Sequence, residues 1–368
     1  MRIGIDARMY GAKATTGIGV YTKNLIEHLL KIDKKNQYVL FMSASGFKEF
    51  TDSRVEKVLV KSHWYSWAEQ LEMPRVLLKH KLDLIHFPHF NVPILYPKKF
   101  VVTIHDLTPL FFPGPRVKKS IIRKIGYHQV IRSAVKKSRK IITVSQFTKE
   151  NIVKNLKVSP EKIKLTYLGY NDQVFKNTSN FDFSNLKNKY KITKDFIFYL
   201  GVLRDHKNIP SLIASFNQLK ENYDLQLVLG GSLDDRFPEV RQAIESSPAH
   251  QDIIVTGFIP DEDLPLMYNA AKLFVLPSFS EGFGLVAIES AACGTPVIAA
   301  NNSCLPEILE DAGIYFDPQN IKEITKTITR VLTDNELYRG LQERGLEQVK
   351  KYSWDQCAQA TLDIYESV

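Results

Sequence analysis

The chain alternates short apolar segments rich in β-branched residues with longer segments of helical periodicity, and the alternation begins again near its midpoint. This pattern is typical of parallel sheets whose strands are joined by crossover helices, so it predicts two doubly wound α/β units. The strands expected in the first unit are Arg2–Asp6, Tyr38–Met42, Val55–Val60, Leu82–Phe87, Phe100–His105, Lys140–Val144 and Lys162–Tyr167. Those expected in the second are Phe196–Leu200, Leu225–Leu229, Ile253–Gly257, Leu273–Pro277, Pro296–Ala299 and Gly313–Phe316.

A length of 368 residues supports the same division, because single hydrophobic cores rarely grow so large. We predict Rossmann-like domains at residues 1–172 and 195–352, with a polar linker region at 173–194. A final helix at 353–368 is expected to pack back toward the N-terminal domain. Open α/β sheets bind ligands beyond the carboxyl ends of their strands. Two such domains, facing across a cleft, should therefore carry their functional residues directly after strands.

The first residues place charged side chains where a signal peptide needs an apolar run, and no uninterrupted apolar run of about 18 residues occurs. The cysteines Cys293, Cys304 and Cys357 are odd in number and lack metal-ligand spacing, which favours a reducing compartment and buried, structural thiols. We expect a cytoplasmic protein whose membrane contact, if it has one, is peripheral and at the inner face of the cell membrane.

A net charge of +9 suits nucleic acid, an anionic membrane surface or a phosphorylated substrate. Residues 116–140 contain ten lysines and arginines and no acid, which predicts a basic amphipathic helix. Its apolar positions, near helical spacing, are Ile121, Ile122, Ile125, Val130, Ile131, Ala134 and Val135. Three roles remain open: the solvated face of a packed helix, docking on anionic lipid, and nucleic-acid binding, for which no reader motif is present.

The most informative motif spans residues 277–298, where a loop of small residues follows an expected strand and a helix should begin near Phe283. The free N–H groups and the positive dipole end of that helix would form an anion site. Gly282 and Gly284 would let the backbone approach a diphosphate closely. Glu281 and Glu289 are two helical turns apart, so we expect them on about the same face, accepting hydrogen bonds from sugar and ribose hydroxyls.

Cations follow the first strand of the second half. A positive charge placed there in advance would stabilise an anion at this edge, such as a diphosphate whose charge grows during a reaction. Lys207 is the main candidate for this role and Arg204 is the second. Salt bridges on a surface turn are the alternative explanation for both residues.

In the first half, His105 and Asp106 end a strand, and a histidine near neutral pH can donate a hydrogen bond to a bound ligand or accept one from it. His86 and His89 are expected either to be buried core histidines or to face an acceptor substrate. The loop after the first strand holds Gly17 and Gly19 but lacks the third glycine of a dinucleotide fingerprint.

Together these segments resemble the retaining glycosyltransferases of family 4, which have the GT-B fold, and the resemblance extends over almost the whole chain. Its most specific part is the pattern of Glu, seven residues, Glu within an EGFG loop. The resemblance implies catalytic roles for His105, Lys207, Arg204 and Glu281. It implies donor binding by Gly282, Phe283, Gly284, Leu285, Glu289, Gly257, Phe258 and Ile259. It implies acceptor binding by Gly17, Gly19, Tyr21 and Asp106, although Val20 stands where the family often has an arginine.

The resemblance further implies a nucleoside-diphosphate sugar as co-substrate, with no cofactor, and retention of configuration. We expect no metal, because no Asp-x-Asp pattern follows an expected strand, and no nucleic-acid partner, because no reader motif accompanies the charge. Ile5–Arg8, the Gly-Ile-Gly-x-Tyr loop and His105–Pro109 resemble the mannosyltransferase branch that builds bacterial surface polysaccharides. This favours GDP-mannose as donor and a saccharide acceptor, which can be lipid-linked. UDP-sugars remain open as donors. A sugar-nucleotide epimerase or phosphorylase, and a non-catalytic protein that binds anions, remain open as other functions.

Overall fold

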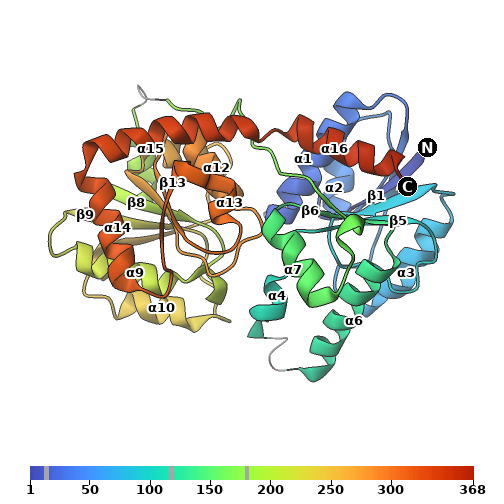
Figure 1. Ribbon diagram of the computed structural model, residues 1–368, viewed down its shortest axis with the longest axis horizontal. Coiled ribbons are helices and arrows are strands. Elements are labelled where there is room, and N and C mark those ends of the chain that lie inside the picture. The colour runs from blue at the N-terminus through green and yellow to red at the C-terminus, as the bar shows by residue number, and fades with distance from the viewer. Residues whose placement is uncertain (12–15, 116–119, 179–181) are drawn as a thin grey trace. The chain divides into compact units, whose positions relative to one another are not determined.

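The computed structural model describes residues 1–11, 16–115, 120–178 and 182–368. They form two units, each built on its own sheet (Figure 1). Unit 1 comprises Met1–Leu107, Arg116–Gly169 and Ser353–Val368, and unit 2 comprises Thr108–Pro115 and Tyr170–Tyr352. Residues expected to form a linker belong to unit 2, where helix α8 (Ser184–Tyr190) is held through Lys189 and Tyr190, which both hydrogen-bond Asp263.

Unit 1 has a parallel sheet of seven strands in the order β3-β2-β1-β4-β5-β6-β7, and every strand predicted for this half is present, with ends within two residues of the prediction. The strands are β1 (Arg2–Ala7), β2 (Gln37–Met42), β3 (Glu56–Leu59), β4 (Leu84–Phe87), β5 (Phe100–Ile104), β6 (Lys140–Thr143) and β7 (Ile163–Leu165). The helices are α1 (Gly17–Ile32), α2 (Ala44–Glu49), α3 (Trp67–Leu78), α6 (Ile121–Lys137), α7 (Gln146–Leu156) and α16 (Trp354–Glu366).

The C-terminal helix α16 packs against α1 within unit 1. Asp355 at its start accepts hydrogen bonds from His28 and Lys31 of α1. Near its end, the Tyr365 hydroxyl lies 2.6 Å from Nδ1 of His86 on β4. These contacts attach the last residues of the chain to the sheet formed by the first.

Unit 2 has a parallel sheet of six strands in the order β10-β9-β8-β11-β12-β13, and all six strands predicted for this half are present. They are β8 (Asp195–Leu200), β9 (Leu225–Gly230), β10 (Ile253–Gly257), β11 (Leu273–Leu276), β12 (Val297–Ala300) and β13 (Gly313–Phe316). Its other helices are α4 (Thr108–Phe111), α9 (Ile209–Leu219), α10 (Pro238–Glu245), α11 (Leu264–Ala270), α12 (Leu285–Ala292), α13 (Leu305–Leu309), α14 (Ile321–Thr333) and α15 (Asn335–Gln348). Residues 108–115 join this unit because the ring of Phe112 stacks on Phe279.

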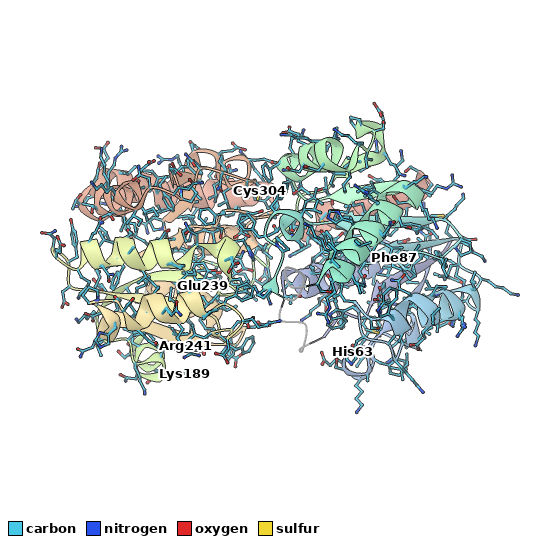
Figure 2. All side chains as sticks on the ribbon, turned by 90° about the horizontal axis from the view of Figure 1, so that it is seen from below. His63, Phe87, Lys189, Glu239, Arg241 and Cys304 are labelled. Carbon is cyan, nitrogen blue, oxygen red and sulfur yellow. The ribbon has the colours of Figure 1, made fainter. Side chains whose placement is uncertain are left out.

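Buried strands supply both cores, and most charged side chains lie at the surface, although Arg8, Glu69 and Glu289 are buried. Phe87 and Cys304 are buried, whereas Lys189, Glu239 and Arg241 are exposed (Figure 2). The three cysteines are buried free thiols, as expected. None of the helices among the described residues is both long and apolar enough to cross a bilayer.

The basic helix predicted at 116–140 is α6, although residues 116–119 lie outside the described residues. Only some of the apolar residues expected along this helix are buried. Ile131, Ala134 and Val135 are buried, but Ile121, Ile122 and Ile125 are 70%, 69% and 54% exposed. Seventeen helical residues span about 25 Å and the five residues of β5 about 17 Å, so the first turns of α6 extend past the sheet (Figure 1).

Candidate functional site

Two predicted site residues meet at the carboxyl edge of the sheet in unit 2. Lys207 follows β8 and Glu281 follows β11, and these strands are neighbours. The Lys207 Nζ donates a hydrogen bond to the Glu281 Oε1 at 2.6 Å, and the two side chains are only 15% and 11% exposed. A cation and a carboxylate that are largely shielded from water interact more strongly than an exposed pair.

The loops that carry this pair are joined by Asn208, to which the sequence analysis gave no role. Its backbone adopts the left-handed conformation at φ 56°, and its buried amide donates hydrogen bonds to the carbonyls of Pro277 and Pro318. The Phe279 N–H also donates to the His206 carbonyl at 2.8 Å. The loops after β8, β11 and β13 are therefore fixed to one another, which holds Lys207 and Glu281 in place.

Helix α12 begins beside this pair at Leu285, two residues after Phe283, near which its start was predicted. Gly284 precedes it with φ 84°, and a Cβ there would lie 2.8 Å from the Cδ2 of Leu305. Only glycine fits this position without strain. The first backbone bond of the helix runs from the Ala287 N–H to the Gly284 carbonyl. The backbone N–H groups of the first helical turn, which can bind an anion, therefore lie one to two residues later than expected.

The later start also corrects the expected relation between Glu281 and Glu289. Because Glu281 lies in the loop and only Glu289 lies on α12, the two glutamates do not share a helical face. Glu289 is buried, and its Oε2 accepts a hydrogen bond from the Tyr268 hydroxyl at 3.0 Å. Burial raises the pKa of Glu289 to about 8, although the Tyr268 hydroxyl opposes that rise.

The second predicted cation, Arg204, lies in the loop after β8, and its side chain contacts residues of the loop after β9. Its Nε is 3.9 Å from the Asp234 Oδ2, its guanidinium lies over the Phe237 ring at 5.8 Å, and its side chain is 42% exposed. The structure thus gives Arg204 partners other than Glu281. At the end of β10, Gly257 has φ 72°, Phe258 is exposed and Ile259 is buried, so of these three only Phe258 presents a side chain to solvent.

In unit 1, His105 lies directly after β5 and is half-buried. Its Nε2 is 2.9 Å from the carbonyl oxygen of Pro88, and because a carbonyl only accepts, Nε2 carries the proton. Burial lowers the pKa of His105, against the effects of the Pro88 hydrogen bond and Asp106. A neutral His105 therefore presents Nδ1 as an acceptor. Asp106, the next residue, is also half-buried.

Tyr21 is fully buried and packs edge-on against His105, with ring centroids 4.7 Å apart. Its hydroxyl lies 3.0 Å from the Thr103 hydroxyl, which is 2.7 Å from the His86 Nε2. We therefore correct the acceptor role inferred for Tyr21: its ring supports His105 from inside the core. His86 is a satisfied core histidine, and burial lowers its pKa to about 3.

The predicted glycines of the first loop lie at the start of α1. Gly17 is exposed, and Gly19 donates its N–H to the Thr16 hydroxyl, which caps the helix. The sequence analysis missed another cluster at this edge, in which Arg8 contacts the carboxylates of Asp6 and Glu69. The available signal was the pair of charged residues, Asp6 and Arg8, at the end of a buried strand. Glu69, however, lies 61 positions from Arg8, and no local pattern in the sequence links these two residues.

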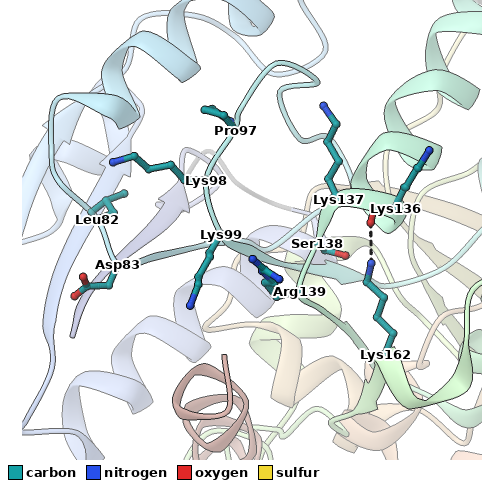
Figure 3. Close-up of a pocket in the computed structure, with 10 residues that line it drawn as sticks. All are labelled: Leu82, Asp83, Pro97, Lys98, Lys99, Lys136, Lys137, Ser138, Arg139 and Lys162. Atoms are coloured by element: carbon teal, nitrogen blue, oxygen red, sulfur yellow. Dashed lines mark hydrogen bonds between the residues drawn. The ribbon is translucent and has the colours of Figure 1, made fainter.

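The opposite, amino edge of the same sheet carries a basic hollow of about 670 Å³ (Figure 3). Asp83, Lys99, Arg139 and Lys162 each stand just before a strand there, and several lysines extend from its rim. The lining residues are Leu82, Asp83, Pro97, Lys98, Lys99, Lys136, Lys137, Ser138, Arg139 and Lys162. Six cations face one acid, so the hollow is suited to anions but lies at the edge where α/β sheets do not place their main ligand.

Two Rossmann-like units with parallel sheets define the GT-B class of fold. The solved structure of Anabaena Alr3699/HepE in complex with UDP-glucose has the same fold, with a TM-score of 0.80 over 100% of this chain and 99% of that one, at 17% identity.

Family models match in both halves of the sequence, one described as Glycosyltransferase Family 4 over residues 15–174 and one as Glycosyl transferases group 1 over residues 182–348. The chain therefore belongs to the family 4 glycosyltransferases. It is 29% identical over 374 residues to O-antigen chain mannosyltransferase B of Escherichia coli, covering 95% of this chain and 96% of that protein. It is 27% identical over 269 residues to O-antigen chain mannosyltransferase RfbU of Salmonella typhimurium, covering 73% and 70%.

Proposed function

We propose that this glycosyltransferase moves mannose from GDP-mannose onto a saccharide acceptor in the synthesis of a bacterial surface polysaccharide. The names of two relatives, both O-antigen chain mannosyltransferases, support the sugar and the product class. The observation that carries the proposed chemistry is the shielded pair of Lys207 and Glu281 beside the start of α12. Neither a cofactor nor a metal takes part in the proposed reaction.

The reaction leaves negative charge on the departing diphosphate, and unit 2 carries the groups that can stabilise that charge. The bond from the sugar C1 to the diphosphate oxygen breaks, and the acceptor oxygen bonds to C1 from the same face. Bond formation on the face that the diphosphate leaves gives retention, and the acceptor proton passes to the departing phosphate. An ammonium group has three N–H donors, so Lys207 can keep its bond to Glu281 and still donate to the diphosphate. The amides at the start of α12 stabilise the same charge.

Glu281 has a second carboxylate oxygen that can accept from a hydroxyl of the transferred sugar, and Glu289 would hold the ribose. We assign the base to the exposed edge around Gly257 and Phe258. In unit 1, the Nδ1 of a neutral His105 would accept a hydrogen bond from a sugar hydroxyl. Arg204 would reach the diphosphate only by leaving Asp234.

The decisive experiment replaces Lys207 by Met and Glu281 by Gln and measures sugar transfer from labelled GDP-mannose and from labelled UDP-glucose. Each change should lower transfer by about 10²-fold or more, the usual effect of removing one group that stabilises transition-state charge. Lys272→Met and Asp195→Asn are the matched controls. They break an exposed ion pair between the same two strands at the opposite edge, where the atoms are 3.1 Å apart.

Wild-type activity in the Lys207 and Glu281 variants would refute the proposed site. Transfer from UDP-glucose alone would replace GDP-mannose with a UDP-sugar, the donor class seen with HepE. Conversion of the labelled donor without any acceptor would indicate an epimerase.

We also propose that unit 1 touches the cytoplasmic face of an anionic membrane, which would give access to a lipid-linked acceptor. Ile121, Ile122 and Ile125 are exposed on α6 beside Arg123 and Lys124, a combination typical of a helix that lies at a lipid interface. The basic hollow adds cations that can attract phosphate head groups.

A further inference from the structure

The loop that carries Glu281 is also held by the residues that follow β12. The Asn302 Nδ2 donates a hydrogen bond to the Phe279 carbonyl at 3.3 Å, and the Cys304 Sγ donates one to the Glu281 carbonyl at 3.4 Å. Because a carbonyl oxygen only accepts, the amide nitrogen of Asn302 is the atom that faces Phe279. Two donors from one short segment therefore fix two carbonyls of the loop in which Glu281 lies.

These two contacts continue the register of the sheet beyond its last backbone pair. In the ladder between β11 and β12, Leu276 pairs with Ala299, and this separation of 23 positions is also that of both hydrogen bonds. Within a parallel ladder, backbone N–H groups supply the donors. After the two strands end, the side chains of Asn302 and Cys304 supply them instead. The contacts are therefore an ordered extension of the sheet into the loop.

The segment after β12 has an unusual backbone at this point. Ser303, between the two donors, has φ 54°, in the left-handed region that serine seldom adopts. Backbone strain of this kind persists where the surrounding contacts fix the chain, and it is commonest at functional sites. The next residue after Cys304 is Leu305, which lies so close to Gly284 that a Cβ there would be 2.8 Å from its Cδ2. The segment thus lies against the end of the loop as well as its middle.

The thiol of Cys304 is suited to act only as a donor toward this carbonyl. Cys304 is fully buried, and burial together with the nearby Glu281 carboxylate raises the pKa of the thiol well above its usual range. The thiol therefore keeps its proton at neutral pH. Lys207 bonds the side chain of Glu281 while Cys304 bonds its backbone, so this glutamate is held at both ends.

We propose that Asn302 and Cys304 are positioning residues that set the Glu281 carboxylate for the sugar of the donor. Fixing the Phe279 and Glu281 carbonyls limits how the loop can turn, and hence where the carboxylate can lie. The proposal rests on the proposed function, in which Glu281 accepts from a hydroxyl of the transferred sugar. It adds two residues that act on the sugar part of the donor and leave its nucleotide part unaffected.

Removing the Cys304 donor should separate binding of the sugar nucleotide from binding of the nucleotide. The probes are GDP-mannose and GDP, measured by isothermal titration without acceptor, or UDP-glucose and UDP if transfer uses that donor. We expect Cys304→Ala to weaken binding of the sugar nucleotide about threefold, the effect of one weak hydrogen bond, and to change binding of the nucleotide less than about 1.5-fold.

Two further variants serve as controls for the binding experiment. Cys304→Ser keeps a donor at the same position and should restore most of the lost binding. Cys357→Ala removes another buried thiol, which lies in unit 1, and should change neither affinity.

Transfer kinetics test whether the contact acts through Glu281. Cys304→Ala should lower kcat about fivefold in the wild-type background and leave the KM for the acceptor unchanged. In a Glu281→Ala background the same change should add almost nothing, because the side chain that it positions is already absent. If Cys304→Ala does not fold by circular dichroism, Asn302→Ala is measured in both backgrounds with the same expectation.

Three results would overturn the positioning role. They are an equal loss of nucleotide and sugar-nucleotide binding, a Cys304→Ser variant as weak as Cys304→Ala, and an undiminished effect in the Glu281→Ala background. Transfer that requires Glu281 but neither Cys304 nor Asn302 would leave the proposed function standing and remove this proposal. Wild-type transfer by Glu281→Ala would instead remove the proposed function itself.

Discussion

The carboxyl edges of the two sheets are built from different chemistry. In unit 2, Lys207 and Glu281 meet beside Gly284, whose left-handed backbone conformation only glycine adopts without strain. This edge therefore offers a ligand charged side chains and backbone N–H groups. In unit 1 the corresponding edge carries neutral His105, supported by buried Tyr21, and an Arg8 whose charge is balanced by carboxylates. The first edge suits a diphosphate and the second suits uncharged hydroxyls, although both sheets have the same parallel architecture.

The two edges also respond to pH in opposite directions. Burial lowers the pKa of His86 and of His89 to about 3, so unit 1 loses stability as pH falls below about 6.5, where the unfolded histidines bind protons and the folded ones do not. Burial raises the pKa of Glu289 to about 8, so unit 2 loses stability as pH rises above about 4.5, where the unfolded chain releases that proton first.

The largest expected effect comes from Gly284→Ala. The new Cβ would meet Leu305 at 2.8 Å and would also be strained at φ 84°, so the start of α12 must move. We expect nucleotide affinity and sugar transfer to fall about 10²-fold, as when a preset donor at developing charge is removed. Isothermal titration with GDP and the transfer assay measure the two effects.

Gly294→Ala, just after the other end of α12, is the matched control. Gly294 also has positive φ, at 75°, but a Cβ there meets only the movable side chain of Asn177. Both variants should lose about 1 kcal/mol of stability from backbone strain, and only Gly284→Ala should lose nucleotide binding. Equal nucleotide affinity in the two variants would remove the special role of the helix start.

Much of the difference between the two edges could be predicted from the sequence, because it depends on which residues follow each strand. All thirteen strands of the described residues were predicted. Lys207 and Glu281 were selected because they follow expected strands and match the family's motif, and those strands proved to be neighbours. The start of α12 lies two residues after Phe283 because Gly284 ends the loop by its left-handed conformation, a detail that composition does not reveal. Burial of Tyr21 and the contact of Arg8 with Glu69 depend on packing between distant segments, for which the sequence has no local signal.

Glu289→Gln tests the opposite pH responses. The amide keeps a partner for the Tyr268 hydroxyl but cannot ionise, so it removes the loss of stability that the glutamate causes as pH rises. Between about pH 4.5 and pH 8, the variant should gain about 1.4 kcal/mol of unfolding free energy per pH unit relative to wild type. Chemical denaturation at pH 5, 6.5 and 8 measures the trend.

Tyr268→Phe sharpens the same test. It removes the hydrogen bond that opposes the raised pKa of Glu289, so the loss of stability should extend to higher pH than in wild type. Parallel curves for wild type and Glu289→Gln would show that Glu289 is not the group that titrates.

Two replacements of His105 test which nitrogen of the imidazole serves the reaction. Gln can reach the Pro88 carbonyl in place of Nε2 but has no acceptor at the position of Nδ1, whereas Asn can place its carbonyl oxygen there and loses Pro88. If Nδ1 accepts from a sugar hydroxyl, His105→Gln should lower kcat about tenfold more than His105→Asn, the effect of one hydrogen bond. The reverse order would make the Pro88 contact, and hence ring position, the important one.

The smallest expected effect lies outside the two sites at the carboxyl edges, on the first turns of α6. Ile122 and Ile125 together expose most of two aliphatic side chains, and covering about half of that area at a lipid interface contributes about 1 kcal/mol. Ile122→Ser with Ile125→Ser should therefore weaken sedimentation with vesicles rich in phosphatidylglycerol about fivefold and leave nucleotide binding unchanged. Leu59→Ser is the control, because Leu59 is 45% exposed in the same unit but lies on the edge strand β3. Equal losses in both variants would mean that general hydrophobicity holds the protein on the vesicles, whereas a loss confined to α6 would place the membrane contact on this helix.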